Sequence, residues 1–259
     1  MTTKKTLVAV SFGTSVQNAD SSIVAVEHIY AEMVPGWNFC RAYTSPTIRR
    51  ILNGRGIRIE SLPEVLARLA EEDPNQLVVV QPTHFFYGIE YDKIRDTVQE
   101  YSSRFTRILL GKPLASGNDE LQRLARIVMD EYLPEEGALV LMGHGTVHYG
   151  NMTYPAFQTT IRLAGARNAY VGTVDGWPRI EDVIAQLKED GHRKVRLVPL
   201  MLVAGLHARK DMAGPQPTSW VNLLEADGFE VECIYQGLGE LPQVQQIYAE
   251  HLKELLNGI

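Results

Sequence analysis

Short apolar runs alternate with amphipathic stretches along the whole chain. The runs are a few residues long and rich in aliphatic side chains, which is typical of strands buried on both faces. The stretches between them repeat apolar residues at intervals of three and four, as one face of a helix does. This alternation predicts βαβ units and a parallel sheet. The predicted strands are residues 6–12, 38–43, 76–80, 106–110, 138–142, 169–174, 195–203 and 229–235.

Helical spacing connects most of these strands. Ser61 is followed three residues later by Glu64, which predicts a capping box ahead of an apolar stripe. Pro178 is expected in the first turn of a helix, where the missing N–H has no cost. Pro199 interrupts the run 195–203, so this strand is expected to be an edge strand, to carry a bulge or to end early. The predicted helices are 20–34, 47–52, 62–69, 91–101, 121–128, 151–163, 178–189 and 241–256.

A glycine- and proline-containing stretch divides the pattern into two parts. Residues 111–118, with the sequence GKPLASGN, are the best candidate for a linker. We therefore expect an N-terminal α/β half at residues 1–115 and a C-terminal α/β half at residues 116–259. The last helix is a candidate to pack back on the first half.

The two halves carry a weak internal repeat. The segment LVAVSFGT resembles the later segment LVLMGHGT, and the match aligns Phe12 with His144 at an offset of 144 − 12 = 132 residues. The segment GIE, which ends at Glu90, resembles GLH, which ends at His207, at an offset of 207 − 90 = 117 residues. The repeat predicts two similar halves that face each other across a cleft.

Composition and charge narrow the classes of partner. The chain is 45% hydrophobic and 22% charged, as an ordinary globular protein is. Its formal net charge of −6 argues against nucleic acid as a partner, because nucleic acid binding needs a concentrated basic surface. No apolar run approaches the ~18 residues of a membrane span, and the N-terminal segment lacks a signal-peptide cleavage site. We therefore expect a cytoplasmic protein without a membrane partner.

Four apolar runs end near a side chain that can bind a metal or move a proton. His144 stands between two glycines directly after the run 138–142, so its imidazole is expected to be uncovered. His84, Asp175 and His207 each follow another predicted strand within a few residues. Ligands bind at the carboxyl ends of strands in open α/β sheets. Imidazole and carboxylate groups suit a borderline divalent metal such as Co²⁺, Ni²⁺, Fe²⁺ or Zn²⁺.

Each candidate also has a structural interpretation. His144 would be a turn residue whose ring caps a carbonyl, and Asp175 would be a turn or helix N-cap residue. His207 would be a satisfied structural histidine. His84 precedes an aromatic cluster that would either pack in the core or line a flat apolar ligand. On the residues alone these alternatives stay open, whereas His251 falls on a helix and is expected to be solvated.

Several nucleotide and hydrolase motifs are absent from the sequence. There is no GxxxxGK followed by Ser or Thr, and no GxGxxG after the first strand, which argues against ATP-driven chemistry and dinucleotide binding. There is no GxSxG segment, so a hydrolase interpretation of the Gly-His-Gly turn lacks its nucleophile.

Four segments carry a family resemblance: SFGTS at 11–15, MGHG at 142–145, VGTVD at 171–175 and PLMLVAGLH at 199–207. Together they resemble the anaerobic-pathway cobalt chelatases, which are sirohydrochlorin cobaltochelatases of the class II, ATP-independent chelatase superfamily. The likeness covers essentially the whole chain. It implies an α/β fold of two similar Rossmann-like halves, each with a central parallel sheet flanked by helices, with the tetrapyrrole in the cleft between them.

The resemblance also implies which residues act. It places the two catalytic, metal-binding histidines at His144 and His207. The third metal-site residue of the family is usually a glutamate, and the matching position here is Asp175, which is one methylene shorter. Co²⁺ is implied as the substrate metal, with no nucleotide cofactor and a tetrapyrrole, sirohydrochlorin or its oxidised-ring relative, as the partner. The residues expected to bind this substrate are Ser11, Phe12, Thr14, His84, Phe85 and Glu90.

Metal insertion requires that two pyrrole protons leave and that the metal passes from protein ligands to the ring. The hypothesis is that neutral His144 and His207 hold Co²⁺ with Asp175, and that one histidine accepts a pyrrole proton. One alternative is a non-catalytic carrier of metal, haem or another tetrapyrrole. Another is a chelatase for Fe²⁺ or Ni²⁺, or a dechelatase, on the same scaffold. A homo-oligomer also stays open.

Overall fold

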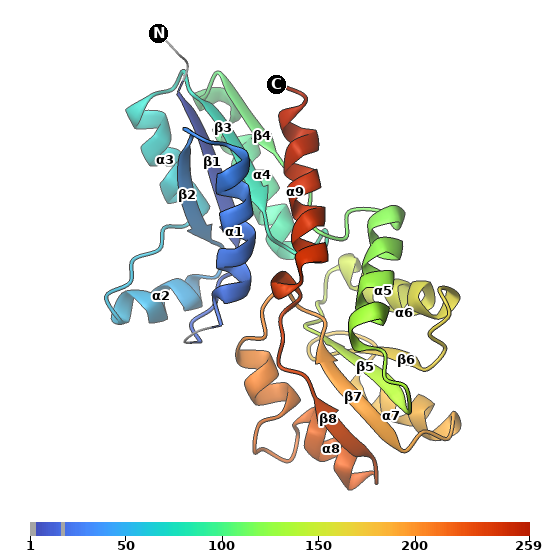
Figure 1. Ribbon diagram of the computed structural model, residues 1–259. Coiled ribbons are helices and arrows are strands. Elements are labelled where there is room, and N and C mark those ends of the chain that lie inside the picture. Colours follow the sequence, from blue (N-terminus) through green and yellow to red (C-terminus); the bar gives the residue numbers. More distant parts are fainter. Residues whose placement is uncertain (1–3, 17–18) are drawn as a thin grey trace. The chain divides into compact units, whose positions relative to one another are not determined.

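The computed structural model describes residues 4–16 and 19–259, which fold into two compact units (Figure 1). Unit 1 comprises Met1–Leu114 together with Pro242–Ile259, and unit 2 comprises Ala115–Leu241. Each unit contains one four-stranded parallel sheet. The cleft expected between the two halves stays a prediction.

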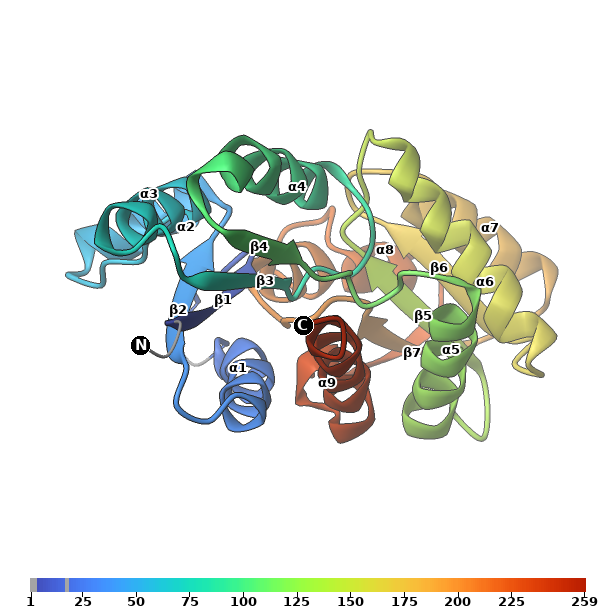
Figure 2. The same cartoon turned by 90° about the horizontal axis from the view of Figure 1, so that it is seen from above.

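Unit 1 is built on a sheet with the strand order β2-β1-β3-β4. Figure 2 shows helices α1 and α9 on one face of this sheet and helices α3 and α4 on the other. Every residue of β3, with the sequence LVVVQP, is buried, as a near-continuous aliphatic run predicts for a central parallel strand. The elements are β1 (Lys5–Ser11), α1 (Ser21–Met33), β2 (Asn38–Tyr43), α2 (Pro46–Gly54), α3 (Leu62–Glu72), β3 (Leu77–Pro82), α4 (Ile89–Tyr101), a 3-10 turn (Ser102–Arg104), β4 (Arg107–Leu110) and α9 (Pro242–Leu256).

Helix α9 is part of the core of unit 1. The rings of Tyr30 on α1 and Tyr248 on α9 are fully buried and meet edge to face, with their centroids 6.4 Å apart. The Tyr248 hydroxyl donates a hydrogen bond to the backbone oxygen of Thr83, directly after β3, at 2.7 Å. The same packing buries His251, which is 3% exposed, so the prediction of a solvated His251 is wrong.

Unit 2 repeats this topology with the strand order β6-β5-β7-β8. Counted along each unit, both sheets have the order second, first, third, fourth, which confirms the prediction of two similar parallel α/β halves. The elements are α5 (Asn118–Tyr132), β5 (Ala138–Gly143), a 3-10 turn (Tyr149–Met152), α6 (Thr153–Leu163), β6 (Ala169–Thr173), α7 (Ile180–Glu189), β7 (Lys194–Pro199), a π-helical turn η3 (Ala208–Met212), α8 (Trp220–Ala226), β8 (Glu230–Cys233) and a 3-10 turn (Leu238–Glu240).

The predicted elements differ from the structure mainly at their ends. The capping box of Ser61 and Glu64 is present at the start of α3. β7 ends at Pro199, so the strand expected over 195–203 ends early. Pro178 is not in a helix, because its carbonyl oxygen accepts hydrogen bonds from the backbone N and Oγ1 of Thr173 at 2.7 and 2.9 Å and holds it in a loop. The hydrophobic pattern does not predict α8 or η3, which are too short to show a clear period.

No helix within residues 4–16 and 19–259 combines the length and the apolar character that crossing a bilayer requires.

Candidate active site

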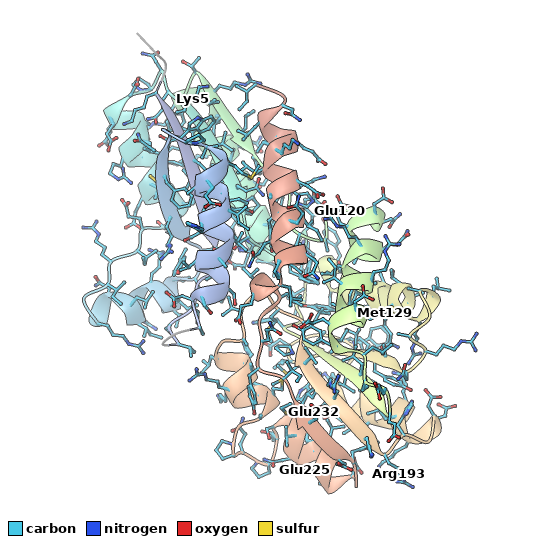
Figure 3. The ribbon with its side chains drawn as sticks, viewed as in Figure 1. Lys5, Glu120, Met129, Arg193, Glu225 and Glu232 are labelled. Carbon is cyan, nitrogen blue, oxygen red and sulfur yellow. The ribbon has the colours of Figure 1, made fainter. Side chains whose placement is uncertain are left out.

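The turn after β5 organises the candidate site. Gly143 ends the strand, His144 follows, and Gly145 has a φ of +81°, in the left-handed region that favours glycine. A Cβ atom on Gly143 would overlap the ring of Tyr154, and one on Gly145 would overlap the backbone nitrogen of Gly176. Both glycines are therefore required for steric reasons. The turn leaves the His144 side chain 43% exposed at the carboxyl end of the sheet, the end opposite the one marked by Arg193 in Figure 3.

The side chains of the buried Tyr154 and the half-buried Asn151 hold this turn by hydrogen bonds. The backbone nitrogen of Gly145 donates to the Tyr154 hydroxyl at 3.2 Å, and burial raises the pKa of Tyr154 to about 12, which keeps the phenol neutral. The Asn151 side chain accepts a hydrogen bond from the backbone nitrogen of Thr146 at 3.1 Å and donates one to the backbone oxygen of Trp177 at 2.6 Å. These bonds connect the His144 turn with the loop after β6 and fix both backbones.

That loop places Asp175 beside His144. The backbone nitrogen of Asp175 donates to the His144 carbonyl at 2.8 Å. Oδ2 of Asp175 lies 4.0 Å from Nδ1 of His144, beyond hydrogen-bond distance, and the carboxylate side chain is 61% exposed. The aspartate is therefore a neighbour of His144 that does not hydrogen-bond to its ring.

The structure brings His144 and His207 together although they come from different strands. Their ring centroids are 4.4 Å apart, with an angle of 77° between the ring planes. Nδ1 of His144 lies 2.9 Å from the carbonyl oxygen of Gly145, and Nδ1 of His207 lies 2.6 Å from Oδ2 of Asp211. A carbonyl and a carboxylate only accept, so Nδ1 is the donor in each neutral ring and Nε2 keeps its lone pair. Two such nitrogens can bind a divalent metal.

A third ligand is not in place beside these two nitrogens. Among residues 4–16 and 19–259, no three His, Cys, Asp or Glu side chains are arranged so that they could hold one ion together. The ligand set of His144, Asp175 and His207 therefore stays a prediction. Two imidazoles stand close together, and the exposed carboxylate lies next to one of them.

Of the expected substrate residues at the end of β1 in unit 1, Phe12 alone presents an exposed side chain, and it is 43% exposed. The Ser11 hydroxyl is buried and lies 2.7 Å from the Thr83 hydroxyl. Thr14 is buried as well, and its hydroxyl accepts a hydrogen bond from the backbone nitrogen of Val16 at 3.2 Å. Ser11 and Thr14 therefore stabilise the loop that carries Phe12.

His84, Phe85 and Glu90 follow β3 in the same unit. Both ring nitrogens of His84 are buried and have no hydrogen-bond partner within the described residues. Burial lowers the pKa of His84 to about 4, against an opposing effect of Glu90, so the imidazole is neutral. Burial raises the pKa of Glu90, but the hydrogen bond and the charge of Lys93 act in the opposite direction, and the pKa falls below its usual value. The rings of Phe85 and Phe86 meet edge to face at 5.8 Å.

Comparisons with known proteins decide the family. The model of the cobalt chelatase family (CbiK) matches residues 5–257. The chain belongs to this family. It is 36% identical over 258 residues to the sirohydrochlorin cobaltochelatase of Salmonella typhimurium, covering 98% of this chain and 97% of that protein. It is 29% identical over 263 residues to the sirohydrochlorin cobaltochelatase CbiKC of Nitratidesulfovibrio vulgaris, covering 99% and 92%.

A solved structure supports the fold of this cobalt chelatase family member. SirB from Bacillus subtilis with Fe³⁺ has a TM-score of 0.64 at 17% identity and covers 98% of this chain and 97% of its own. The match to the family model and the 36% identical relative confirm the family resemblance carried by the four sequence segments.

The sequence pattern did not point to two features of the site. Asp211 contacts the His207 ring, and the only available signal was the four-residue spacing between them, which places two side chains on one face of a helical turn. Apolar side chains are also exposed in the loop after His144: Val147 is 94% exposed, Tyr149 is 75% exposed and Met152 is 64% exposed. Exposed apolar groups next to an imidazole pair suit a flat, partly apolar ligand.

Proposed function

We propose that this chain is a sirohydrochlorin cobaltochelatase, which inserts Co²⁺ into sirohydrochlorin, or into its oxidised-ring relative, without ATP. The observation that carries the proposal is the pair of imidazoles of His144 and His207, 4.4 Å apart at the carboxyl end of a sheet. It is supported by membership of the cobalt chelatase family and by the names of the relatives at 36% and 29% identity.

The two histidines supply the groups that metal insertion needs. With Nδ1 of each ring donating to a fixed acceptor, the two Nε2 lone pairs bind the incoming ion. Two nitrogens leave most of the coordination sphere to water and then to the pyrrole nitrogens, so the ion can pass on, as it could not from a complete tight cage. As the metal passes to the ring, one imidazole Nε2 releases the ion and accepts one pyrrole proton, and the second pyrrole proton passes to water.

The remaining residues have supporting roles in this proposal. Asp175 provides a carboxylate beside the ion and completes the proposed metal set with His144 and His207. The substrate contacts are Phe12, His84, Phe85 and Glu90, on a backbone held by Ser11 and Thr14. The exposed apolar side chains of Val147, Tyr149 and Met152 offer a surface for the macrocycle.

The test is turnover in the absence of ATP. Purified protein is mixed with sirohydrochlorin and Co²⁺, and insertion is followed by the change in the visible absorbance of the tetrapyrrole. We expect many turnovers per protein molecule, and a rate at the uncatalysed background for the double variant H144A/H207A. Stoichiometric binding without turnover would support the carrier instead. Faster insertion of Fe²⁺ or Ni²⁺ at equal free concentration would support the other chelatase.

Other expectations about the setting of the protein stay predictions. They are a cytoplasmic location, the absence of nucleic acid and membrane partners, and an oligomeric state that the sequence leaves open.

A further inference from the structure

The contact between His207 and Asp211 is short and built into one turn. Nδ1 of His207 lies 2.6 Å from Oδ2 of Asp211, and the two side chains are 32% and 27% exposed. The residues stand four positions apart at the π-helical turn η3, which begins directly after His207. Ala208 and Met212, also four positions apart, are fully buried in the core of unit 2. The buried pair anchors the turn, and the neighbouring pair is thereby held in register at the surface.

Further hydrogen bonds hold the same turn. The backbone nitrogen of Gly214 donates to the carbonyl of Lys210 at 3.0 Å, and Nε2 of Gln216 donates to that same carbonyl. The backbone nitrogen of Arg209 donates to the carbonyl of Gly205 at 3.3 Å. The backbone that carries Asp211 is therefore fixed by hydrogen bonds, and it holds the carboxylate next to His207.

The two site histidines differ in what holds Nδ1. In His144 the acceptor at 2.9 Å is the carbonyl of the adjacent residue, Gly145, and the neighbouring carboxylate of Asp175 is 4.0 Å away. In His207 the acceptor is a carboxylate at 2.6 Å. A charged acceptor makes a stronger hydrogen bond than a carbonyl does, and it fixes both the ring orientation and the tautomer.

We propose that Asp211 is a positioning residue, which holds His207 in the tautomer with the proton on Nδ1 and turns Nε2 toward the ion and the substrate. Its effect on catalysis rests on the chelatase activity proposed above, whereas its effect on the tautomer does not. The carboxylate acts through His207 and does not itself bind the metal.

The first test is the tautomer, read from the nitrogen spectrum of metal-free protein labelled with ¹⁵N-histidine. The His207 signals are assigned by their loss in His207→Ala. We expect the Nδ1–H form in the wild type and in Asp211→Asn, whose amide oxygen still accepts the proton, and a mixture of both tautomers in Asp211→Ala. An Nε2–H form in the wild type, or an unchanged spectrum in Asp211→Ala, would overturn the proposal.

The second test is the division of the effect between kcat and KM. Loss of the carboxylate partner of a metal-binding histidine typically costs about 10–100-fold. We expect a decrease of this size in kcat for Asp211→Ala, a smaller decrease for Asp211→Asn, and an unchanged KM for sirohydrochlorin. A wild-type kcat in Asp211→Ala, or an equal decrease in both variants, would show that the carboxylate does not position the ring.

A matched control separates positioning from stability. Asp182→Ala also removes a carboxylate from unit 2, one that accepts a hydrogen bond from the backbone nitrogen of Arg179 at the start of α7. It should lower stability without changing the His207 spectrum or kcat, and an equal loss of kcat in this variant would count against the proposal. If the wild type shows no turnover, the proposed function fails, while the nitrogen spectrum still decides the role of Asp211.

Discussion

β1 of unit 1 ends at Ser11 and β5 of unit 2 ends at Gly143, so the residues that follow, Phe12 and His144, stand at equivalent places. Two positions after each strand end is a glycine with positive φ, +93° at Gly13 and +81° at Gly145. The offset of 132 residues found in the sequence repeat is therefore also the offset between the two turns. The same backbone presents a phenyl ring in one unit and an imidazole in the other.

The other two site positions show the same relation. β3 and β7 end at Pro82 and Pro199, an offset of 199 − 82 = 117 residues, which is the offset that aligns Glu90 with His207. The backbone nitrogen of Ser45 donates to the Phe12 carbonyl at 3.3 Å, as that of Asp175 donates to the His144 carbonyl at 2.8 Å.

Unit 1 thus carries Phe12, Ser45 and Glu90 where unit 2 carries His144, Asp175 and His207. The scaffold provides the positions in both units, and the chemistry depends on which side chains occupy them. Imidazole nitrogens occur at these places in unit 2 alone, because the side chains of Phe12, Ser45 and Glu90 contain no nitrogen.

The most direct test of this comparison is to replace equivalent residues of the two units with alanine. His144→Ala removes a proposed ligand and proton acceptor and should lower kcat for Co²⁺ insertion by about 10³-fold. Phe12→Ala removes an apolar contact and should raise KM for sirohydrochlorin by no more than about tenfold. Steady-state absorbance assays measure both. Equal losses of kcat in the two variants would show that Phe12 and His144 do not differ in role as proposed.

A second difference between the units concerns the burial of their histidine rings. The ring nitrogens of His84 in unit 1 are buried, and this burial lowers the pKa of His84 from 6.5 to about 4. The unfolded chain therefore takes up a proton between about pH 6.5 and pH 4 while the folded chain does not, so the free energy of unfolding should fall by up to about 3 kcal/mol as the pH is lowered through this window. Urea unfolding at a series of pH values measures this slope.

The same series with His84→Asn should lose that part of the slope. His28→Asn is the matched control, because it makes the same exchange at a histidine whose side chain is 72% exposed. An unchanged slope in His84→Asn would assign the pH dependence to other groups.

The equivalent glycines provide the third test. A side chain in the left-handed region costs about 1–2 kcal/mol, so Gly13→Ala and Gly145→Ala should each lower the free energy of unfolding by at least this amount. Gly145→Ala should also lower kcat, because the new Cβ overlaps the backbone of Gly176 next to Asp175. Gly36→Ala gives the cost of φ alone, since its φ is +81° and no atom lies within 4 Å of the added Cβ.

The smallest effects are expected at Asp175 and at its counterpart in unit 1, Ser45. Asp175→Asn should lower kcat by about tenfold if a charged oxygen assists the ion, which corresponds to ~1.4 kcal/mol. Asp175→Glu keeps the carboxylate on a side chain one methylene longer and should stay within about threefold of the wild type. Ser45→Ala removes the N-cap acceptor for the backbone nitrogen of Ile48 and should cost about 1 kcal/mol of stability with no change in kcat. A wild-type rate in Asp175→Asn would remove Asp175 from the metal set.

Much of the fold could be predicted from the sequence, because central parallel strands are apolar at every position and helices are apolar at every third or fourth. β3 is such a strand, and α3 has its capping box in the sequence itself. The prediction that Pro178 lies in a helix was wrong. Its carbonyl oxygen accepts a hydrogen bond from the Thr173 hydroxyl, and a contact between two residues cannot be read from a hydrophobic pattern.

The site was predictable to a different degree at each residue. The glycines on either side of His144 indicate an exposed turn, and the structure contains that turn. The distance between the His144 and His207 rings depends on the pairing of β5 with β7, which local spacing cannot give. Asp211 could not be predicted from strand ends, because it lies in the short π-helical turn η3, further along the chain than the end of β7.

Because of helix α9, the two units are completed at different times during synthesis. In unit 2, α5 packs against α6, and the whole unit is one continuous segment of the chain. In unit 1, the corresponding place beside α1 is taken by α9, which follows β4 only after all of unit 2. A ribosome therefore releases every residue of unit 2 before it releases the helix that covers Tyr30. The part of the chain with the histidine pair can fold first, and the part that carries Phe12 waits for residues 242–256.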